Sequence, residues 1–312
     1  MKAVQISQYG DAGVLAVATS VSKPTPGEGQ VLVEVHAASI NPVDSMVRLG
    51  YMQKMAPLTF PATLGTDMAG VVIEAGPKVA GFRKGDKVFG MASLLAGGSG
   101  AFAEYATASA AALARFPSTL HFSQAAALPL TAVSALEVIE EKLKIQKGQK
   151  ILIHGGAGGI GSIAIQLAKH HGASVAATAL GEAADYVKSL GADKVIDFQK
   201  EAFDSLLSGY DFVFDTVAGD TYKKSFAVLK KGGTIISMLE QPNVELASQY
   251  GVTALAQGTQ VTTARLERVG ELVTKGVIKV HVEKAYPVEN VKEAFLARES
   301  GKVKGKVVLT FA

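Results

Sequence analysis

The chain has 312 residues, a length typical of two domains with ample core. Hydrophobic residues make up 48% of it and charged residues 19%, which excludes an intrinsically disordered chain. The 31 Lys and Arg nearly balance 28 Asp and Glu, and the charges are spread along the sequence, so we expect no nucleic-acid partner.

Two further features restrict the class of protein. No apolar run reaches the roughly 18 residues that span a bilayer, and no signal-peptide core follows Met1, so we expect a cytoplasmic protein without a membrane partner. The absence of cysteine excludes disulfides, thiolate nucleophiles and cysteine-ligated zinc, and none of the six histidines has HExxH spacing. We therefore expect no metal site.

The first third of the chain is predicted to be rich in strands and turns. Apolar and polar residues alternate in short segments that Gly and Pro separate. The candidate strands are residues 30–38, 70–76, 86–91 and 102–107. This spacing predicts a small barrel or sandwich.

The pattern changes near residue 122, where Ser123 is the predicted cap of a helix that Pro129 breaks. Apolar residues then recur at helical spacing up to Gly148, and beyond it strands and helices alternate. The candidate strands are residues 150–154, 174–179, 194–198, 211–215 and 234–238, and the helices between them include 160–171 and 182–190. This alternation predicts an α/β fold with a doubly wound parallel sheet.

The C-terminal part contains a strand candidate at residues 252–260 and an amphipathic stretch at 264–275. After Gly276 the chain returns to a β pattern that closes with residues 307–311. We expect this tail to rejoin the N-terminal domain. The predicted domains are therefore a discontinuous β-rich domain, residues 1–123 and 279–312, and a domain of residues 124–278 that holds the parallel sheet.

A glycine-rich loop follows the first strand of the parallel sheet. The pattern GxGxxG falls on Gly156, Gly158 and Gly161, between a strand and a helix, which is the context in which it binds dinucleotides. Gly156 is predicted to allow the tight turn, Gly158 to let the backbone approach a pyrophosphate, and Gly161 to let helix and sheet pack closely. The alternative is a glycine-rich turn without a ligand.

The choice between NADPH and NADH depends on the end of the next strand. About 20 residues after the first glycine, where an NAD-binding acid is expected, the sequence reads Thr178-Ala179-Leu180. The acid is missing, which leaves room for a 2′-phosphate, and Lys188 is the nearest cation along the sequence. We therefore expect NADPH in preference to NADH.

With this loop behind a β-rich domain, the sequence resembles the medium-chain dehydrogenase/reductase superfamily, and more closely its zinc-independent quinone oxidoreductases. The resemblance implies a Rossmann domain and a GroES-like domain. It extends over nearly the whole chain, through residues 31–44, 65–76, 85–88, 100–105, 128–135, the glycine loop, 190–198 and 305–306.

The sequence departs from the zinc alcohol dehydrogenases of that superfamily. Residues 41–44, Asn-Pro-Val-Asp, stand where those enzymes carry their first Cys and a following His, and Gly65-Thr66-Asp67 replaces their Gly-His-Glu. The resemblance thus implies chemistry without a Lewis acid. Hydride transfer from a reduced nicotinamide to a quinone, or to the β-carbon of an enone, fits because these acceptors are already electron-poor.

The resemblance also implies three catalytic candidates. It places Asn41 near the nicotinamide, where its amide could donate to a carbonyl, although an Asn before a proline also forms turns. It places Tyr51 at the mouth of the substrate site, and the alternative is an ordinary half-buried Tyr. It places Thr131 beside the nicotinamide carboxamide, and the alternative is a role in the helix break. Asp44 is expected chiefly to cap a helix.

Other polar residues carry structural alternatives. His154 ends the first strand of the parallel sheet, where a structural role is expected, and His170-His171 fits a solvated helix end. Lys306 matches a family position near the cofactor, with a surface lysine as the alternative. The predicted cofactor-binding residues are Gly156, Ala157, Gly158, Gly159, Ile160, Gly161, Thr178, Ala179, Lys188 and Lys306.

Three functions fit this sequence. The first is an NADPH-dependent, zinc-independent reductase of quinones or α,β-unsaturated carbonyls. The second is an NADPH-binding redox sensor or structural protein with little turnover, and the third is a zinc-free alcohol dehydrogenase. We also expect a homodimer that pairs through an edge strand at residues 252–260.

Overall fold

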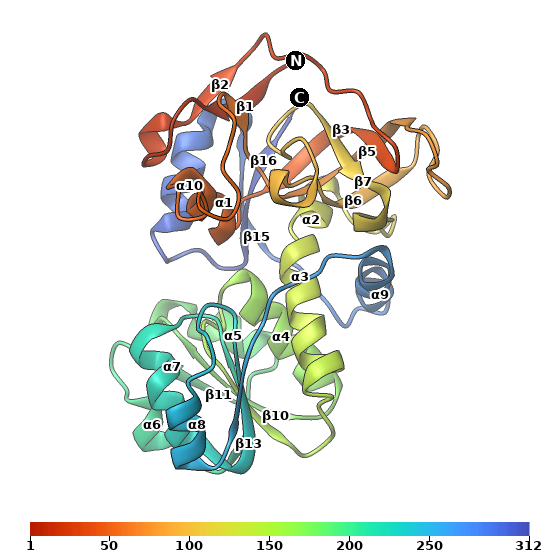
Figure 1. Cartoon of the computed structure of the whole chain (residues 1–312). Helices are drawn as coiled ribbons and strands as arrows, with labels where there is room; N and C mark the ends of the chain where they lie inside the picture. Colours follow the sequence, from red (N-terminus) through yellow and green to blue (C-terminus); the bar gives the residue numbers. More distant parts are fainter. Residues whose placement is uncertain (312) are drawn as a thin grey trace. The chain divides into compact units, whose positions relative to one another are not determined.

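A computed structural model describes residues 1–311 and divides the chain into two compact units. Unit 1 comprises Met1–Leu130, Val261–Lys275 and the chain from Val280 onward, and unit 2 comprises Thr131–Gln260 and Gly276–Lys279. The colours of Figure 1 show that red and blue segments from opposite ends of the sequence lie side by side in unit 1. The sequence assigned residues 264–275 to the domain of the parallel sheet, whereas the structure groups them with unit 1.

Unit 1 is built around the ten-residue strand β3, Gln30–Ser39. The larger sheet has the order β15-β16-β3-β5-β6-β8, with β7 also paired to β3, and a small sheet has the order β2-β1-β4. The other strands are β1 Ala3–Ile6, β2 Ala16–Ala18, β4 Ala62–Thr63, β5 Asp67–Ala75, β6 Lys87–Met91, β7 Tyr105–Ser109, β8 Leu113–Arg115, β15 Val282–Pro287 and β16 Lys306–Thr310. Strand β7 begins later than the predicted segment 102–107.

The C-terminal strand closes this sheet, as the sequence predicted. Strand β16 pairs antiparallel with β3, with Leu309 opposite Ala38. Strand β3 also pairs with β5, and two irregularities in that pairing let it bend between its partners. Its valines Val31, Val33 and Val35 are buried in the core of unit 1. The end of β3 and the C-terminal strand are therefore held side by side in one sheet.

The helices of unit 1 are α1 Pro42–Arg48, α2 Phe122–Ala126, α9 Thr263–Thr274 and α10 Val291–Glu299. An ion pair of 2.7 Å between the buried Arg48 and the partly exposed side chain of Glu299 joins α1 to α10. The prediction that Ser123 caps α2 is wrong, because Ser123 lies inside the helix and His121 precedes it. The His121 N–H donates to the Gln124 side chain at 3.1 Å, and this bond satisfies a backbone group at the start of the helix.

Unit 2 contains a six-stranded sheet in the order β11-β10-β9-β12-β13-β14, and every pairing in it is parallel. The strands are β9 Lys150–Ile153, β10 Ser174–Ala179, β11 Lys194–Asp197, β12 Tyr210–Asp215, β13 Leu229–Ser237 and β14 Thr253–Ala256. The chain starts in the middle, winds outward to one edge, and then returns to build the other edge. This order is that of a doubly wound Rossmann sheet, and it confirms the predicted fold class.

Helices pack around the strands of unit 2 (Figure 1). They are α3 Pro129–Leu136, which a π-helical segment Glu137–Lys142 continues, α4 Gly159–His170, α5 Ala184–Ser189, α6 Phe203–Leu206, α7 Gly219–Ser225 and α8 Val244–Tyr250. Helix α4 is buried through Ile163, Ala164, Leu167 and Ala168, as its helical spacing predicted. In residues 1–311 no helix combines the length and the apolar character that crossing a membrane requires.

Candidate functional site

The glycine loop joins the buried strand β9 to helix α4. Gly155 has a φ of +70°, so the left-handed backbone of the tight turn lies at Gly155 and not at Gly156 as predicted. A Cβ at Gly156 would lie 2.9 Å from the Cβ of Ala177, and one at Gly161 would lie 2.2 Å from the Gly155 carbonyl oxygen. Packing alone therefore requires glycine at both Gly156 and Gly161.

Gly158 differs from its neighbours in this loop. A Cβ there would meet its nearest atom, the Gly155 carbonyl oxygen, at 3.4 Å, an ordinary contact. Its backbone is extended, with a φ of −76°, which any residue adopts. Neither packing nor conformation thus requires a glycine at this position, which leaves close approach of a ligand as the reason for it.

Gly158 is also the N-cap of α4, a helix of 12 residues. The first N–H groups of a helix have no acceptor within it, and they lie at the positive end of its dipole. Residues Ala157, Gly159 and Ile160 are half-buried, so this end of the helix remains accessible. Free N–H groups beside a glycine that leaves room for a ligand fit the pyrophosphate of a dinucleotide.

The end of β10 lies against this loop. The Thr178 carbonyl accepts from the Gly156 N–H at 2.9 Å, and its hydroxyl accepts from the Gly155 N–H at 3.4 Å. Ala179 ends the strand and is buried. Lys188 lies in the last turn of α5 and its side chain is exposed. The structure thus brings Thr178 to the loop, and a contact of Lys188 with the cofactor stays a prediction.

His154 supports the loop from below. Its ring is fully buried and forms hydrogen bonds of 3.0 Å to the Thr178 hydroxyl and 2.8 Å to the Ser225 hydroxyl. Burial lowers its pKa to about 4, although the negative charge of Asp215 opposes this shift. His154 is therefore neutral at physiological pH and structural, as the sequence indicated.

A second group of polar residues lies inside unit 1. We call it the buried polar cluster, and its members are at most 5% exposed: Asn41, Asp44, Thr66, Asp67 and Lys306. They come from the segment after β3, from α1, from the segment around the start of β5, and from the first residue of β16. The antiparallel pairing of β3 with both β5 and β16 brings these distant segments together.

Lys306 is the cation of the cluster. Its ammonium donates to the Ile40 carbonyl at 2.8 Å and to the side-chain oxygen of Asn41. The Asn41 amide nitrogen donates in turn to Asp67 at 2.9 Å and to the Ser39 carbonyl at 3.4 Å. Both ends of the Asn41 side chain are therefore engaged within the protein.

Asp67 accepts its contacts through one oxygen. The Leu130 N–H donates to the same Oδ2 at 3.2 Å, whereas Oδ1 is buried without a hydrogen-bond partner. Burial raises the pKa of Asp67 to about 7, although the charge of Lys306 opposes the shift. Burial likewise lowers the pKa of Lys306 to about 8. Both groups thus titrate near neutral pH.

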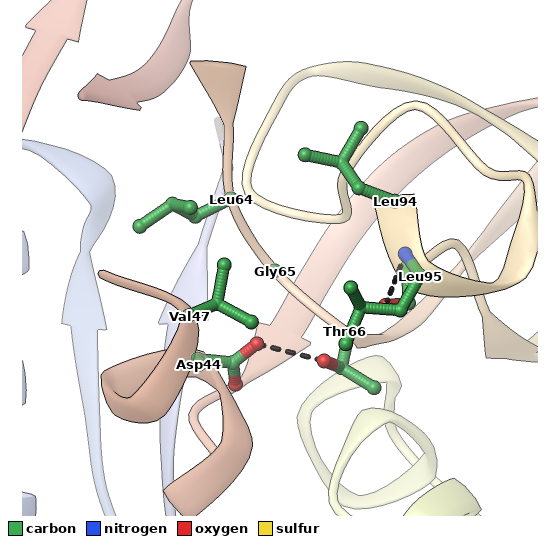
Figure 2. A pocket seen from close by; sticks show the side chains of 8 residues that line it. Asp44, Val47, Leu64, Gly65, Thr66, Leu94 and Leu95 are labelled. Atoms are coloured by element: carbon green, nitrogen blue, oxygen red, sulfur yellow. Dashed lines mark hydrogen bonds between the residues drawn. The ribbon is translucent and has the colours of Figure 1, made fainter. Parts of the chain in front are cut away.

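Asp44 is held on the opposite side of Asn41. One oxygen accepts from the Asn41 N–H at 2.7 Å and so caps α1, as the sequence suggested, and the other accepts from the Thr66 hydroxyl at 2.8 Å. Burial raises the pKa of Asp44 to about 6. Figure 2 shows this Asp44–Thr66 bond at the edge of a small cavity whose other walls include Val47, Leu64 and Leu94. The cavity volume of about 10 Å³ suits about one water molecule.

The other two catalytic candidates lie outside this cluster. Thr131 is buried in α3 of unit 2. Tyr51 is 74% exposed and follows α1 in unit 1, where Met46, Leu49 and Met55 also expose apolar side chains. Four large apolar side chains are thus exposed within ten residues of the sequence.

Sequence reasoning missed Asp67 as a site residue. The available signal was an acid directly before the apolar run Met68-Ala69, at the start of a strand that proved buried. A carboxylate in such surroundings needs a cation or a proton, and Lys306 supplies the cation. In the described part of the chain, no group of three or more His, Asp and Glu side chains is arranged to hold a metal ion.

Comparison with known proteins is consistent with this geometry. Residues 27–118 match the alcohol dehydrogenase GroES-like domain family, and residues 190–309 match a family described as zinc-binding dehydrogenase. The chain is 37% identical to a 2-methylene-furan-3-one reductase of Solanum lycopersicum, over 99% of the chain and 79% of that protein. The chain belongs to the medium-chain dehydrogenase/reductase superfamily.

Further relatives place it among the quinone and alkenal oxidoreductases of that superfamily. It is 36% identical to the chloroplastic NADPH-dependent alkenal/one oxidoreductase of Arabidopsis thaliana, over 99% of the chain and 79% of that protein. The structure of the quinone oxidoreductase from Coxiella burnetii matches with a TM-score of 0.92 and 33% identity, over 100% and 99% of the two chains. The Escherichia coli quinone oxidoreductase complexed with NADPH matches with a TM-score of 0.91 and 26% identity over both whole chains.

Proposed function

We propose that this protein is an NADPH-dependent reductase that transfers hydride to a quinone or to an α,β-unsaturated carbonyl compound. Gly158 is the observation that carries the proposal, because the fold does not require a glycine there and a pyrophosphate does. The named relatives act on the same two classes of acceptor, which supports the substrate assignment.

The cofactor and the chain have separate tasks in this reaction. NADPH, when bound, supplies the hydride. The backbone N–H groups of Ala157, Gly159 and Ile160 bind the pyrophosphate beside Gly158, and Thr178 supports the loop that carries them by accepting from the Gly156 N–H. Reduction of an enone also needs a proton at the α-carbon, and reduction of a quinone needs protons at its oxygens. The exposed apolar side chains around Tyr51 suit the flat apolar body of such a substrate.

The proposal assigns indirect roles to two of the predicted residues. The side-chain oxygen of Asn41 accepts from Lys306, and its amide nitrogen donates to Asp67 and to the Ser39 carbonyl. We therefore assign Asn41 to positioning rather than to donation toward a substrate carbonyl. Lys306 acts through Asn41 in the same way. Thr131 beside the nicotinamide carboxamide, and Tyr51 at the substrate, stay predictions.

The proposed reductase works without zinc. The chain has no cysteine to serve as a zinc ligand. The Asp67 carboxylate accepts from the Asn41 amide, and the nearby charge of the Lys306 ammonium would repel a metal ion placed beside them. A quinone or an enone does not need a Lewis acid, since it already accepts hydride readily.

The test is a panel of acceptors incubated with the protein and NADPH, followed through the loss of NADPH absorbance. Turnover with quinones or alkenals supports the proposal. Binding of NADPH without turnover on any acceptor would favour the alternative of a redox-sensing or structural NADPH-binding protein. Alcohol oxidation with NADP⁺, without enone or quinone reduction, would favour the zinc-free alcohol dehydrogenase.

We also propose a homodimer formed through β14, the edge strand of the parallel sheet. Its Leu255 side chain is 38% exposed, and an edge strand offers N–H and C=O groups to a second copy. The cytoplasmic location stays a prediction, since some relatives are named as chloroplastic.

A further inference from the structure

We propose that Lys200 is the residue that selects NADPH over NADH, and that its ammonium exchanges the Asp197 carboxylate for the 2′-phosphate when the cofactor binds. This inference rests on the proposed function, and it specifies which cation of the chain binds the 2′-phosphate that distinguishes NADPH from NADH. Doubly wound folds distinguish the two cofactors beside the end of the second strand, where an acid holds the ribose hydroxyl of NADH and a cation accommodates the extra phosphate of NADPH.

The structure brings Lys200 to that strand end. Strand β11 pairs with β10 so that Asp197 lies opposite Ala179, and the Phe198 N–H donates to the Ala179 carbonyl at 3.3 Å. The turn that follows is closed by the Lys200 and Glu201 N–H groups, which both donate to the Asp197 carbonyl at 2.9 Å. The turn therefore lies directly beside the residues that end β10.

Gly181 shows how close the two side chains come. A Cβ at Gly181 would lie 2.5 Å from a carboxylate oxygen of Asp197 and 3.8 Å from the Lys200 ammonium. The ammonium lies 3.4 Å from the same carboxylate oxygen. Asp197 is 15% exposed in its side chain, whereas Lys200 is 78% exposed and free to turn toward a ligand.

The other lysines nearby are placed less well. Lys188 lies in the last turn of α5, and among the described residues no hydrogen bond or ion pair joins it to the end of β10, whereas Lys194 begins β11 opposite Ala176, three residues before Ala179. The acids near Lys200 are Asp197, Glu201 and Glu182, and each of them competes with a phosphate for the positive charge of Lys200. Lys200 therefore recognises the phosphate by exchanging one anionic partner for another.

This exchange predicts opposite effects for the two members of the pair. Lys200→Ala removes a charge-assisted contact to the phosphate, and we expect it to weaken NADPH binding about tenfold while NADH binding changes less than about twofold. Asp197→Asn removes the competing anion, and we expect a higher ratio of NADPH to NADH affinity. Because the contact is exposed, the NADPH preference should also decrease as salt is added.

The test is titration calorimetry of the full-length variants with NADPH, NADH, adenosine 2′,5′-bisphosphate and AMP, which reports binding independently of turnover. Lys194→Ala is the matched control, an exposed lysine at the other end of the same strand, and it should leave both affinities unchanged. Lys188→Ala tests whether the lysine that the sequence suggested binds the phosphate instead of Lys200.

The outcomes separate this inference from the proposed function. Loss of affinity for NADPH and for adenosine 2′,5′-bisphosphate in Lys200→Ala alone supports the assignment. Equal NADPH affinity of Lys200→Ala and the unmodified protein overturns it and leaves the reductase proposal intact, as does a loss confined to Lys188→Ala. An unmodified protein that binds neither dinucleotide overturns both.

Discussion

Replacing Lys306 by Met tests whether charge holds the buried polar cluster together. The two side chains are similar in length, so the substitution keeps the packing and removes the ammonium. The Ile40 carbonyl and the Asn41 side-chain oxygen then lose their donor, and Asp67 loses the cation that opposes the rise of its pKa. A buried acceptor left without its donor costs about 1–3 kcal/mol, and the attraction between the charges of Lys306 and Asp67 is lost as well. We expect a loss of about 2–4 kcal/mol of folding free energy near pH 7.5.

The cost should depend on pH, with a sign fixed by the pKa of Asp67. Burial raises this pKa from 3.8 to about 7, so between these values the folded protein binds a proton that the unfolded chain does not. The contribution of Asp67 to stability therefore decreases as the pH rises from about 4 to about 7. At pH 5 Asp67 is already protonated, so Lys306→Met removes hydrogen bonds and also a buried ammonium whose charge burial disfavours. These two effects oppose each other, and we expect a net loss of stability below about 1 kcal/mol.

The assay is urea denaturation followed by circular dichroism at pH 5 and pH 7.5. Lys302→Met is the matched control, because Lys302 is exposed on the same segment and its loss should change stability by less than about 0.5 kcal/mol. An equal loss of stability for Lys306→Met at both pH values would refute the electrostatic argument and leave packing as the cause. A loss below about 1 kcal/mol at pH 7.5 would show that the ammonium is not paired.

Three further predictions concern the cofactor, the metal and the assembly. Gly158→Val places a branched side chain where the pyrophosphate must approach, so NADPH affinity by calorimetry should fall at least a hundredfold with the circular dichroism spectrum unchanged, and unaltered binding would show that the loop is misassigned. Prolonged chelation should leave NADPH oxidation intact, and one stoichiometric zinc per chain by elemental analysis would contradict this. Ala254→Pro removes an N–H from the free side of edge strand β14, because the Gln257 N–H three residues on points to β13, and it should weaken the dimer in light scattering. An unmodified protein that runs as a 32.4 kDa monomer at micromolar concentration would overturn the dimer.

Much of unit 2 was predictable because its structure follows from local pattern. Strand β10 has the predicted bounds, Ser174–Ala179, since a run of small and β-branched residues between two turns leaves little choice. The glycine loop was predictable from spacing, although the left-handed turn falls on Gly155. Lys200 was not predictable, because its position depends on the pairing of β10 with β11 rather than on distance along the sequence.

The buried polar cluster was beyond local pattern for the same reason. Lys306 follows a glycine near the end of the chain and has the appearance of a surface residue, yet it is 5% exposed. Its burial is set by β16 joining β3, which places the lysine beside Asn41 and Asp67 from segments more than 230 residues away. Pairing between distant strands thus decides which charged residues are inside.

One physical criterion separates residues that serve the fold from residues that serve a ligand. Gly156 and Gly161 are explained completely by atoms of the protein itself, whereas Gly158 is not, and only Gly158 therefore points to a bound molecule. Asn41 gives the opposite result. Its amide donates to Asp67 and Ser39 and accepts from Lys306, so donation to a substrate carbonyl would require it to give up one of these bonds. We therefore propose that Asn41 fixes the strand end and the charges around it, and that direct contact with the substrate falls to residues whose polar groups remain exposed, such as Tyr51.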